Sequence, residues 1–201
     1  MQQAAASVIG YQSRYSTAGN FNAAAPYRTT INGLVGAAPT AGYCDKTLSV
    51  FDQVSNQSVC SGGSNQNIAF HYGIDFGVSS ANAGNWSFRV GPDFGRGGAL
   101  FLDGVVLGFK SDDLWWAANW GASGELLSAT VANLAYGNHR FDVYGFEGCC
   151  DGTQSAQFSI GSSGRWTTFA SNDSLAHIPE PGSLALFGIA ALGLVTARRR
   201  K

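Results

Sequence analysis

The chain has 201 residues, a formal net charge of −1 and few charged side chains, with 12 Lys and Arg against 13 Asp and Glu. A nucleic-acid-binding protein normally carries a basic surface patch. The basic residues here cluster only in the last four positions, so we expect no nucleic-acid partner. Glycine is abundant at 27 residues, which favours a turn-rich β protein with a polar, weakly charged surface.

Alternating hydrophobicity predicts a series of β-strands along the chain. Residues 1–43 are rich in Ala, Gly, Thr and Asn and predict only loose strands and loops. The clearest strand runs from Ile68 to Phe76, where apolar side chains occupy every second position. The other predicted strands are 47–51, 86–90, 99–102, 105–109, 114–116, 125–131, 139–146, 154–160 and 165–169. Asp103-Gly104 predicts a tight hairpin turn, because glycine accepts a positive φ.

Strands at this spacing, with no convincing helix among them, predict an all-β fold, an antiparallel β-sandwich or barrel. We divide the chain into a loosely patterned N-terminal part of the body (1–43), a β-sandwich domain (44–170), a linker (171–178) and a C-terminal segment (179–201). A short hydrophobic helix is expected in the C-terminal segment.

The cysteine content is typical of an exported chain with disulfide bonds, because the number is even. The four residues are Cys44, Cys60, Cys149 and Cys150. Their spacing lacks the C-x-x-C pairs of a zinc site. Four cysteines allow three pairings; we favour Cys44 with Cys60 and Cys149 with Cys150, and a crosswise arrangement stays open. The first six residues do not form a complete secretory signal. The true start can lie further upstream, the signal can have been removed, or export can use another route; we favour a missing signal.

Two blocks of the predicted domain resemble the PA14-like β-sandwich found in adhesins, toxins and glycosidase accessory modules. The first block runs from Trp86 to Gly95 and continues in residues 100–104, Leu-Phe-Leu-Asp-Gly. The second runs from Leu134 to Glu147 and ends in residues 155–158. The resemblance covers about residues 84–161. It implies a jelly-roll or barrel form of the sandwich.

In lectin-like members of that family, an Asp-Asp pair in the first loop helps to hold calcium, and the calcium holds a sugar. The matching positions here are Asp93 and Phe94, so one carboxylate is lost. Asp112 and Asp113 form such a pair in a different loop. Calcium takes about six to eight oxygen ligands, of which one or two Asp residues supply only some. We therefore predict no cofactor and no metal site, with calcium at Asp93 kept as the alternative.

The end of the chain resembles the PEP-CTERM sorting signal, in which a Pro-Glu-Pro motif, an apolar run and a basic cluster follow one another. The motif is Pro179, Glu180 and Pro181. The apolar run contains Leu184, Leu186, Phe187, Ile189, Leu192, Leu194 and Val195, and the basic cluster is Arg198, Arg199, Arg200 and Lys201. The Cys-Cys-Asp-Gly sequence at 149–152 resembles the Cys-Cys-x-Gly signature of a group of bacterial surface proteins with this kind of tail. The resemblance implies an exosortase, a membrane Cys transpeptidase, as partner.

The apolar run is short for a stable membrane span. From Leu184 to Ala197 it would measure about 21 Å as a helix, against ~30 Å for a hydrocarbon core. We therefore expect a temporary anchor in the inner membrane of a Gram-negative bacterium, with the basic cluster on the cytoplasmic side. Cleavage would then place the exported body at the cell surface or outside the cell. An ordinary tail anchor that is never cleaved is the alternative.

Tryptophans gather in and just after the predicted strand 114–116, at Trp115, Trp116 and Trp120. Tryptophan rings stack on sugar faces, but they also fill cores, and adjacent residues of a strand point to opposite faces, so at most one of Trp115 and Trp116 lies deep in the core. We take five residues as candidate ligand-binding positions: Asp93, Asp112, Asp113, Trp116 and Trp120. The histidines do not cluster at metal-ligand spacing, and His71, on the polar face of its strand, is expected to be structural or solvated.

These features predict an exported surface or extracellular-matrix protein whose β-sandwich binds, or packs within, exopolysaccharide. A purely structural or adhesive protein without a small ligand is the first alternative. A glycan-acting hydrolase is the second, although the sequence contains no nucleophile, metalloprotease or phosphate-binding motif. We expect no enzymatic activity and assign no catalytic residue.

Overall fold

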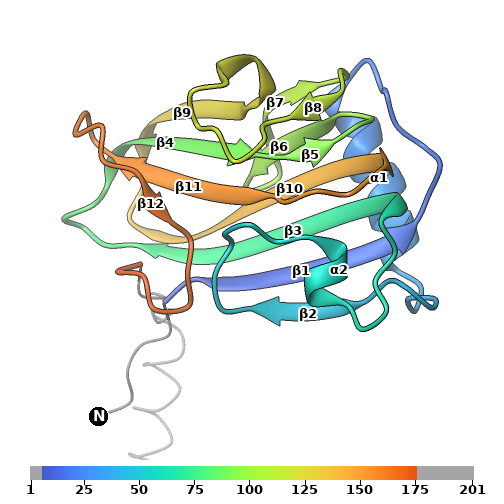
Figure 1. Cartoon of the computed structure of the whole chain (residues 1–201). Coiled ribbons are helices and arrows are strands. Elements are labelled where there is room, and N and C mark those ends of the chain that lie inside the picture. Colours follow the sequence, from blue (N-terminus) through green and yellow to red (C-terminus); the bar gives the residue numbers. More distant parts are fainter. Residues whose placement is uncertain (1–5, 176–201) are drawn as a thin grey trace, which may run out of the picture.

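The computed structural model describes residues 6–175. The predicted sorting motif, apolar run, basic cluster and C-terminal helix all lie outside the described residues. Within the described part, the predicted all-β antiparallel fold is confirmed. Two sheets pack face to face, and a small two-stranded ribbon lies at one end of them (Figure 1).

The larger sheet has six antiparallel strands in the order β2-β1-β3-β10-β6-β7. Its members are β1 (Val8–Tyr15), β2 (Asp45–Leu48), β3 (Gln66–Val78), β6 (Gly98–Leu102), β7 (Val105–Lys110) and β10 (Gly137–Cys149). β3 and β10 are the longest strands and pair along nearly their whole length. The N-terminal part, expected to hold only loose strands and loops, contributes β1, which lies between β2 and β3.

The smaller sheet has four antiparallel strands in the order β12-β11-β4-β9. Its members are β4 (Gly84–Gly91), β9 (Leu127–Leu134), β11 (Ser155–Ile160) and β12 (Thr167–Thr168). The two-stranded ribbon pairs β5 (Asp93–Phe94) with β8 (Leu114–Trp115), and the short 3-10 helix η1 (Ser123–Glu125) precedes β9.

The core lies between the two sheets and is dominated by aromatic rings. Phe76 from the larger sheet contacts Trp86 and Phe88 from the smaller one, with ring centroids 5.5 and 6.1 Å away. Phe88 in turn stacks on Phe141 at 4.8 Å. The predicted alternation of strands 68–76 and 86–90 points these rings inward, and their burial removes large apolar areas from water. The same alternation sends Ser87 and Arg89 to the outer face of the smaller sheet.

A helix that the sequence did not indicate covers part of the outer face of the larger sheet. In α1 (Ala24–Val35), Ala24, Tyr27 and Ile31 are buried against a patch of that face. The patch consists of Ala69, Ala99, Phe101, Tyr144 and Phe146. The expectation of no helix was wrong because tertiary packing of this apolar stripe, rather than local propensity, stabilises α1. Pro26 stands in its first turn, where a missing N–H is tolerated.

The predicted hairpin turn at Asp103-Gly104 is confirmed. Both residues have positive φ, 50° for Asp103 and 77° for Gly104, as a two-residue turn between antiparallel strands requires. The turn joins β6 to β7.

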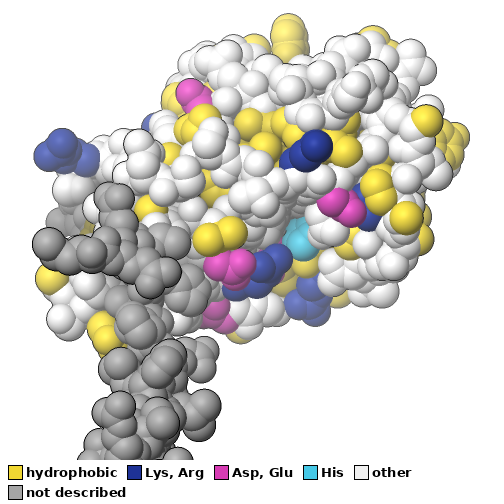
Figure 2. All heavy atoms as spheres, turned by 90° about the horizontal axis from the view of Figure 1, so that it is seen from below, with side chains coloured by type: hydrophobic (Ala, Val, Ile, Leu, Met, Phe, Trp, Pro, Cys, Tyr) yellow, Lys and Arg dark blue, Asp and Glu magenta, His cyan; other side chains and the backbone are white. Residues whose placement is uncertain are grey.

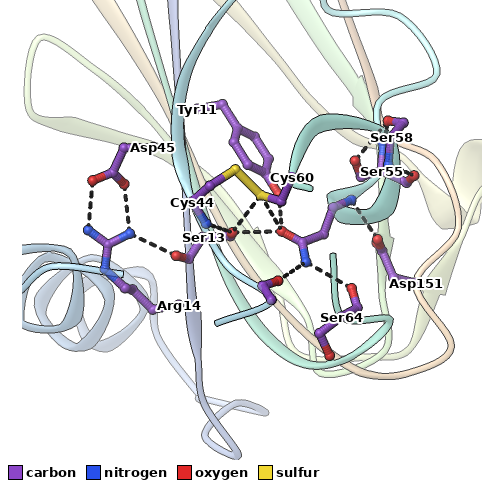
Figure 3. The surroundings of a disulfide bond; sticks show 12 residues. Tyr11, Ser13, Arg14, Cys44, Asp45, Ser55, Ser58, Cys60, Ser64 and Asp151 are labelled. Atoms are coloured by element: carbon purple, nitrogen blue, oxygen red, sulfur yellow. Dashed lines mark hydrogen bonds and ion pairs between the residues drawn. A yellow bond between two sulfur atoms is a disulfide. The ribbon is translucent and has the colours of Figure 1, made fainter. Parts of the chain in front are cut away.

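Two disulfides are present, Cys44–Cys60 and Cys149–Cys150. Figure 3 shows the first beside Ser13 and Tyr11 of β1. The Cys60 Sγ also lies 3.2 Å from Oδ1 of the buried Asn56, which opens the short helix α2 (Asn56–Val59). The Asn56 Oδ1 accepts hydrogen bonds from Tyr11 and Ser13, both at 2.7 Å, and its Nδ2 donates to the carbonyls of Gly42 and Ser64 at 2.8 Å. One side chain thus joins β1, α2, the loop before β2 and the loop after α2.

Candidate functional site

Three buried carboxyl groups hold the loops together at the end of the sandwich where β5, β8 and β10 meet. Asp93 in β5 accepts the backbone N–H of Gly152. Glu147 near the end of β10 accepts the backbone N–H of Gly95. Asp151 accepts the Asn56 backbone N–H at 2.7 Å and the Gln154 Nε2 at 2.9 Å. We call Asp93, Glu147 and Asp151 the carboxyl cluster.

The surroundings of the carboxyl cluster raise the pKa values of its three groups and so favour their protonated, neutral form. Burial raises the pKa of Asp151 to about 7, against hydrogen bonds from Gln154 and Asn56 that lower it, and the neighbouring Asp93 and Glu147 raise it further. Burial also raises the pKa of Asp93 and of Glu147, with repulsion between the two adding to the pKa of Glu147. These groups therefore fasten loops and do not present free carboxylates to solvent.

The position that aligns with the second Asp of the lectin-like calcium pair is a core residue. Phe94 is fully buried and stacks on Phe70 with ring centroids 5.6 Å apart. Its ring lies so close to Gly145 that a Cβ there would come within 2.2 Å. Asp93, the remaining member, already accepts the Gly152 N–H. Across residues 6–175 no group of three or more His, Cys, Asp or Glu is placed to hold a metal ion.

The other predicted acidic pair does not belong to the carboxyl cluster. Asp112 and Asp113 are both exposed and precede β8. Asp113 is near enough to raise the pKa of Asp93 by repulsion, whereas Asp112 acts on Tyr27 of α1. The two side chains thus influence different parts of the molecule.

The three neighbouring tryptophans separate into buried and exposed positions. Trp115 is 66% exposed, and Trp116 is only 2% exposed. The Trp116 ring covers Gly91, where a Cβ would lie 2.3 Å from it, and its Nε1 donates to the Thr153 carbonyl at 2.7 Å. Trp116 is therefore packed inside the end of the domain. It was predicted to contact ligand, but a buried ring cannot offer its face to a sugar.

Trp120 begins a row of stacked groups that leads onto the outer face of the smaller sheet. Its ring lies 4.5 Å from that of Trp116. The Arg89 guanidinium lies 4.3 Å from the Trp120 ring centroid and 4.1 Å from that of Trp166. Arg89 also donates from Nε to the Gln157 Oε1 at 2.9 Å. We call Trp120, Arg89 and Trp166 the aromatic–guanidinium row, and its cation–π contacts hold the rings in place.

A shallow groove of about 350 Å³ adjoins the row on the same sheet face. It is lined by Ser87, Phe88, Ser128, Ala129, Thr130 and Trp166. The Ser87 and Thr130 hydroxyls lie 3.0 Å apart across β4 and β9. Hydroxyl groups beside an indole ring provide both hydrogen bonds and a stacking face, the two features by which a pyranose ring is held.

Sequence reasoning identified Trp120 but missed its partners Arg89, Gln157 and Trp166. The alternation of strand 86–90 already indicated that Arg89 points away from the core. Its pairing with Gln157 follows from the register of β4 and β11, and the approach of Trp166 follows from the loop before β12. Both depend on strand order, which the sequence does not contain.

The Cys149–Cys150 disulfide is exposed at the same end of the sandwich. Glu147 holds the segment before it, because its carboxyl accepts backbone N–H groups of Gly148 and Cys149. The pair therefore projects from an anchored loop.

Comparisons with solved structures place the fold among PA14 domains. The PA14 domain of the MpAFP antifreeze protein superimposes with a TM-score of 0.53 at 13% identity, covering 87% of this chain and 92% of that one. A PA14 sugar-binding domain from an RTX adhesin gives 0.54 at 13% identity, covering 86% and 99%. The A domain of epithelial adhesin 9 from Candida glabrata, in complex with Galb1-3GlcNAc, gives 0.51 at 7% identity, covering 90% and 94%. This chain thus has a PA14-type β-sandwich.

The C-terminal residues carry a recognised sorting element. Residues 177–201 match the PEP-CTERM protein-sorting motif, in agreement with the sequence interpretation, whereas the Cys-Cys-x-Gly subtype stays a prediction. No curated protein matches the chain. None of the helices in the described part, residues 6–175, is long and apolar enough to cross a membrane.

Proposed function

We propose that this chain is an exported bacterial surface protein, sorted by an exosortase through its C-terminal motif, whose PA14-type sandwich binds exopolysaccharide. The match of residues 177–201 to the PEP-CTERM sorting motif supports the export route. The fold shared with a sugar-binding adhesin domain supports glycan binding. The single observation that carries the binding proposal is the aromatic–guanidinium row beside its hydroxyl-lined groove.

In this proposal the row, and not a metal, provides the binding surface. A sugar ring stacks on Trp166, which is 36% exposed, and its hydroxyls exchange hydrogen bonds with Ser87 and Thr130. Arg89 keeps Trp166 and Trp120 in position. Because Phe94 replaces a calcium ligand, binding is independent of calcium.

Affinity electrophoresis through gels that contain the producing organism's own exopolysaccharide tests the binding role. Trp166→Ala removes a stacking ring worth about 1 kcal/mol or more, so we expect binding at least about fivefold weaker. Trp115→Ala is the matched control, because Trp115 is the more exposed indole and lies outside the row. A chelator should leave binding unchanged.

Unaltered mobility of the wild-type protein in the gel would favour the purely structural or adhesive alternative. A loss of binding in Trp115→Ala but not in Trp166→Ala would move the site to the loop end. Release of oligosaccharides from the polymer would instead support the hydrolase alternative.

Intact-mass measurement of protein released from the cell surface tests the sorting role separately. We expect the inner-membrane precursor to contain Lys201 and the released form to lack the residues after Pro181. A variant in which Pro179, Glu180 and Pro181 are all Ala should stay in the membrane fraction at full length. A released wild-type protein that retains Lys201 would contradict exosortase processing.

A further inference from the structure

The strands of the smaller sheet carry almost no charge. Among the residues of β4, β9, β11 and β12, Arg89 is the one Asp, Glu, Lys or Arg. Its partners in the strand register are Gln157 on β11 and Ser128 on β9, both uncharged. Arg89 is therefore a single cation among the polar and apolar side chains of these strands.

Basic side chains of the larger sheet, in contrast, have acidic partners. Arg140 pairs with Asp75 at 2.8 Å and with Asp142 at 3.0 Å, and Asp142 also lies 2.9 Å from a ring nitrogen of His71. Figure 2 views the molecule from the side on which Figure 1 places β1 and β2, and there basic and acidic side chains lie next to each other. Charges that are already paired in this way have little left to offer an ionic ligand.

The Arg89 guanidinium has one hydrogen-bonding edge occupied and one left over. Its Nε and Nη2 both donate to the Gln157 Oε1. Within residues 6–175 its Nη1 makes no hydrogen bond and Arg89 makes no ion pair. Burial lowers the pKa of Arg89, the direction expected of a cation that has lost water without gaining an anionic partner. The edge formed by Nη1 and Nη2 is the one that holds both oxygens of a carboxylate in a bidentate pair.

This cation lies next to the hydroxyl-lined groove. Trp166 lines the groove and also stacks on Arg89, with the guanidinium 4.1 Å from the ring centroid. Ser128, another lining residue, is the direct partner of Arg89 across β4 and β9, and the Cβ atoms of such partners lie about 4.5–5.5 Å apart. A sugar ring that occupies the groove can therefore reach Arg89 with a charged substituent.

We propose that the aromatic–guanidinium row recognises an acidic glycan. A uronate ring lies in the groove against Trp166, and its carboxylate accepts two hydrogen bonds from the Nη1 and Nη2 edge of Arg89. The neighbouring indoles exclude water from part of the guanidinium, which strengthens its attraction for a carboxylate. This inference rests on the proposed function, because it uses the same site, and deepens it by naming the substrate class.

Calorimetric titration of the full chain, with both disulfides intact, compares trigalacturonate with its methyl ester, which has the same sugar rings but no carboxylate. We expect the wild type to bind trigalacturonate at least about tenfold more tightly than the ester, because hydrogen bonds between charged groups are the stronger kind. Arg89→Gln removes the cation and should make the two affinities equal. Lys46→Gln removes the same charge from β2 of the larger sheet and should keep the preference for the acid.

Equal affinity of the wild type for the acid and the ester would overturn the inference, and this comparison depends on no variant. A loss of affinity in Arg89→Gln that is the same for both oligosaccharides would show that Arg89 only positions the tryptophans. A preference lowered as much by Lys46→Gln would show general charge attraction.

Failure of this inference and failure of the proposed function give different results. A wild type that binds neither oligosaccharide, but is retarded by its own exopolysaccharide, would exclude the uronate and leave the proposed function intact. Trp166→Ala should weaken the binding of both oligosaccharides. If it weakens neither, the aromatic–guanidinium row is not the binding surface, and the proposed function itself is contradicted.

Discussion

The buried carboxyl of Asp151 makes the stability of the domain depend on pH. The pKa of this group is about 7 against an ordinary value of 3.8. Between those two values the folded state keeps a proton that the unfolded state has released. The folded state then binds more protons, so the free energy of unfolding falls as pH rises from about 4 to about 7 and levels off above that range.

The size of this effect follows from the difference between the two pKa values. Each tenfold change in proton affinity corresponds to ~1.4 kcal/mol, so the full difference corresponds to about 4 kcal/mol. The Asp151→Asn variant removes the titrating group and keeps its size and one acceptor oxygen. Relative to the variant, the wild type should lose up to about 4 kcal/mol of unfolding free energy between pH 4 and pH 8.

Urea unfolding followed by tryptophan fluorescence at a series of pH values measures this difference. The variant can lose a constant amount of stability through its altered hydrogen bonds to Asn56 and Gln154, so the readout is the change of the difference with pH. Asp112→Asn, which removes an exposed carboxylate, is the control and should give a curve parallel to that of the wild type. Parallel curves for Asp151→Asn and the wild type would refute the assignment.

Two further predictions concern packing and covalent cross-linking. Gly145→Ala places a methyl group against the Phe94 ring and should lower the unfolding free energy by about 1–3 kcal/mol. Gly108→Ala is the control, because it has open space around it, and should leave the unfolding free energy nearly unchanged. Equal urea midpoints for the two variants would contradict this packing. Replacing both Cys44 and Cys60 by Ser should lower the unfolding free energy by about 3 kcal/mol, because the disulfide closes a loop with a sequence separation of 16. An unchanged urea midpoint under oxidising conditions would show that the disulfide does not restrain the unfolded chain.

Much of the sheet could be predicted from the sequence, because its strands have one apolar face towards the core. The alternation of apolar and polar residues in 68–76 and 86–90 correctly predicted which side chains point inward, and Asp103-Gly104 correctly predicted a turn. The helix α1 could not be predicted in this way. Only three of its residues are fully buried, and it is stabilised by a sheet surface assembled from β3, β6 and β10, which are distant in sequence.

The residues of the candidate sites also divide into those that the sequence indicated and those that only the structure brings together. Trp120 was identified because aromatic residues cluster in the sequence, but Trp116 proved to be buried, since it covers Gly91 at the end of β4. Arg89 and Trp166 meet only because β4, β11 and β12 are neighbours in the smaller sheet. Likewise, His71 meets Asp142 only because β3 and β10 are neighbours in the larger sheet.

The sequence by itself determined the chemistry of short segments: the alternating strands, the even cysteine content and the sorting motif at residues 177–201. The strands and the sorting motif depend on residues close together along the chain, and the cysteine content depends on composition alone. Only the tertiary structure decided which exposed groups converge. Strand order and register bring Arg89 to two tryptophans on one face and bring His71, Asp142 and Arg140 together on the other. Such contacts depend on long-range pairing, for which the local pattern carries no information.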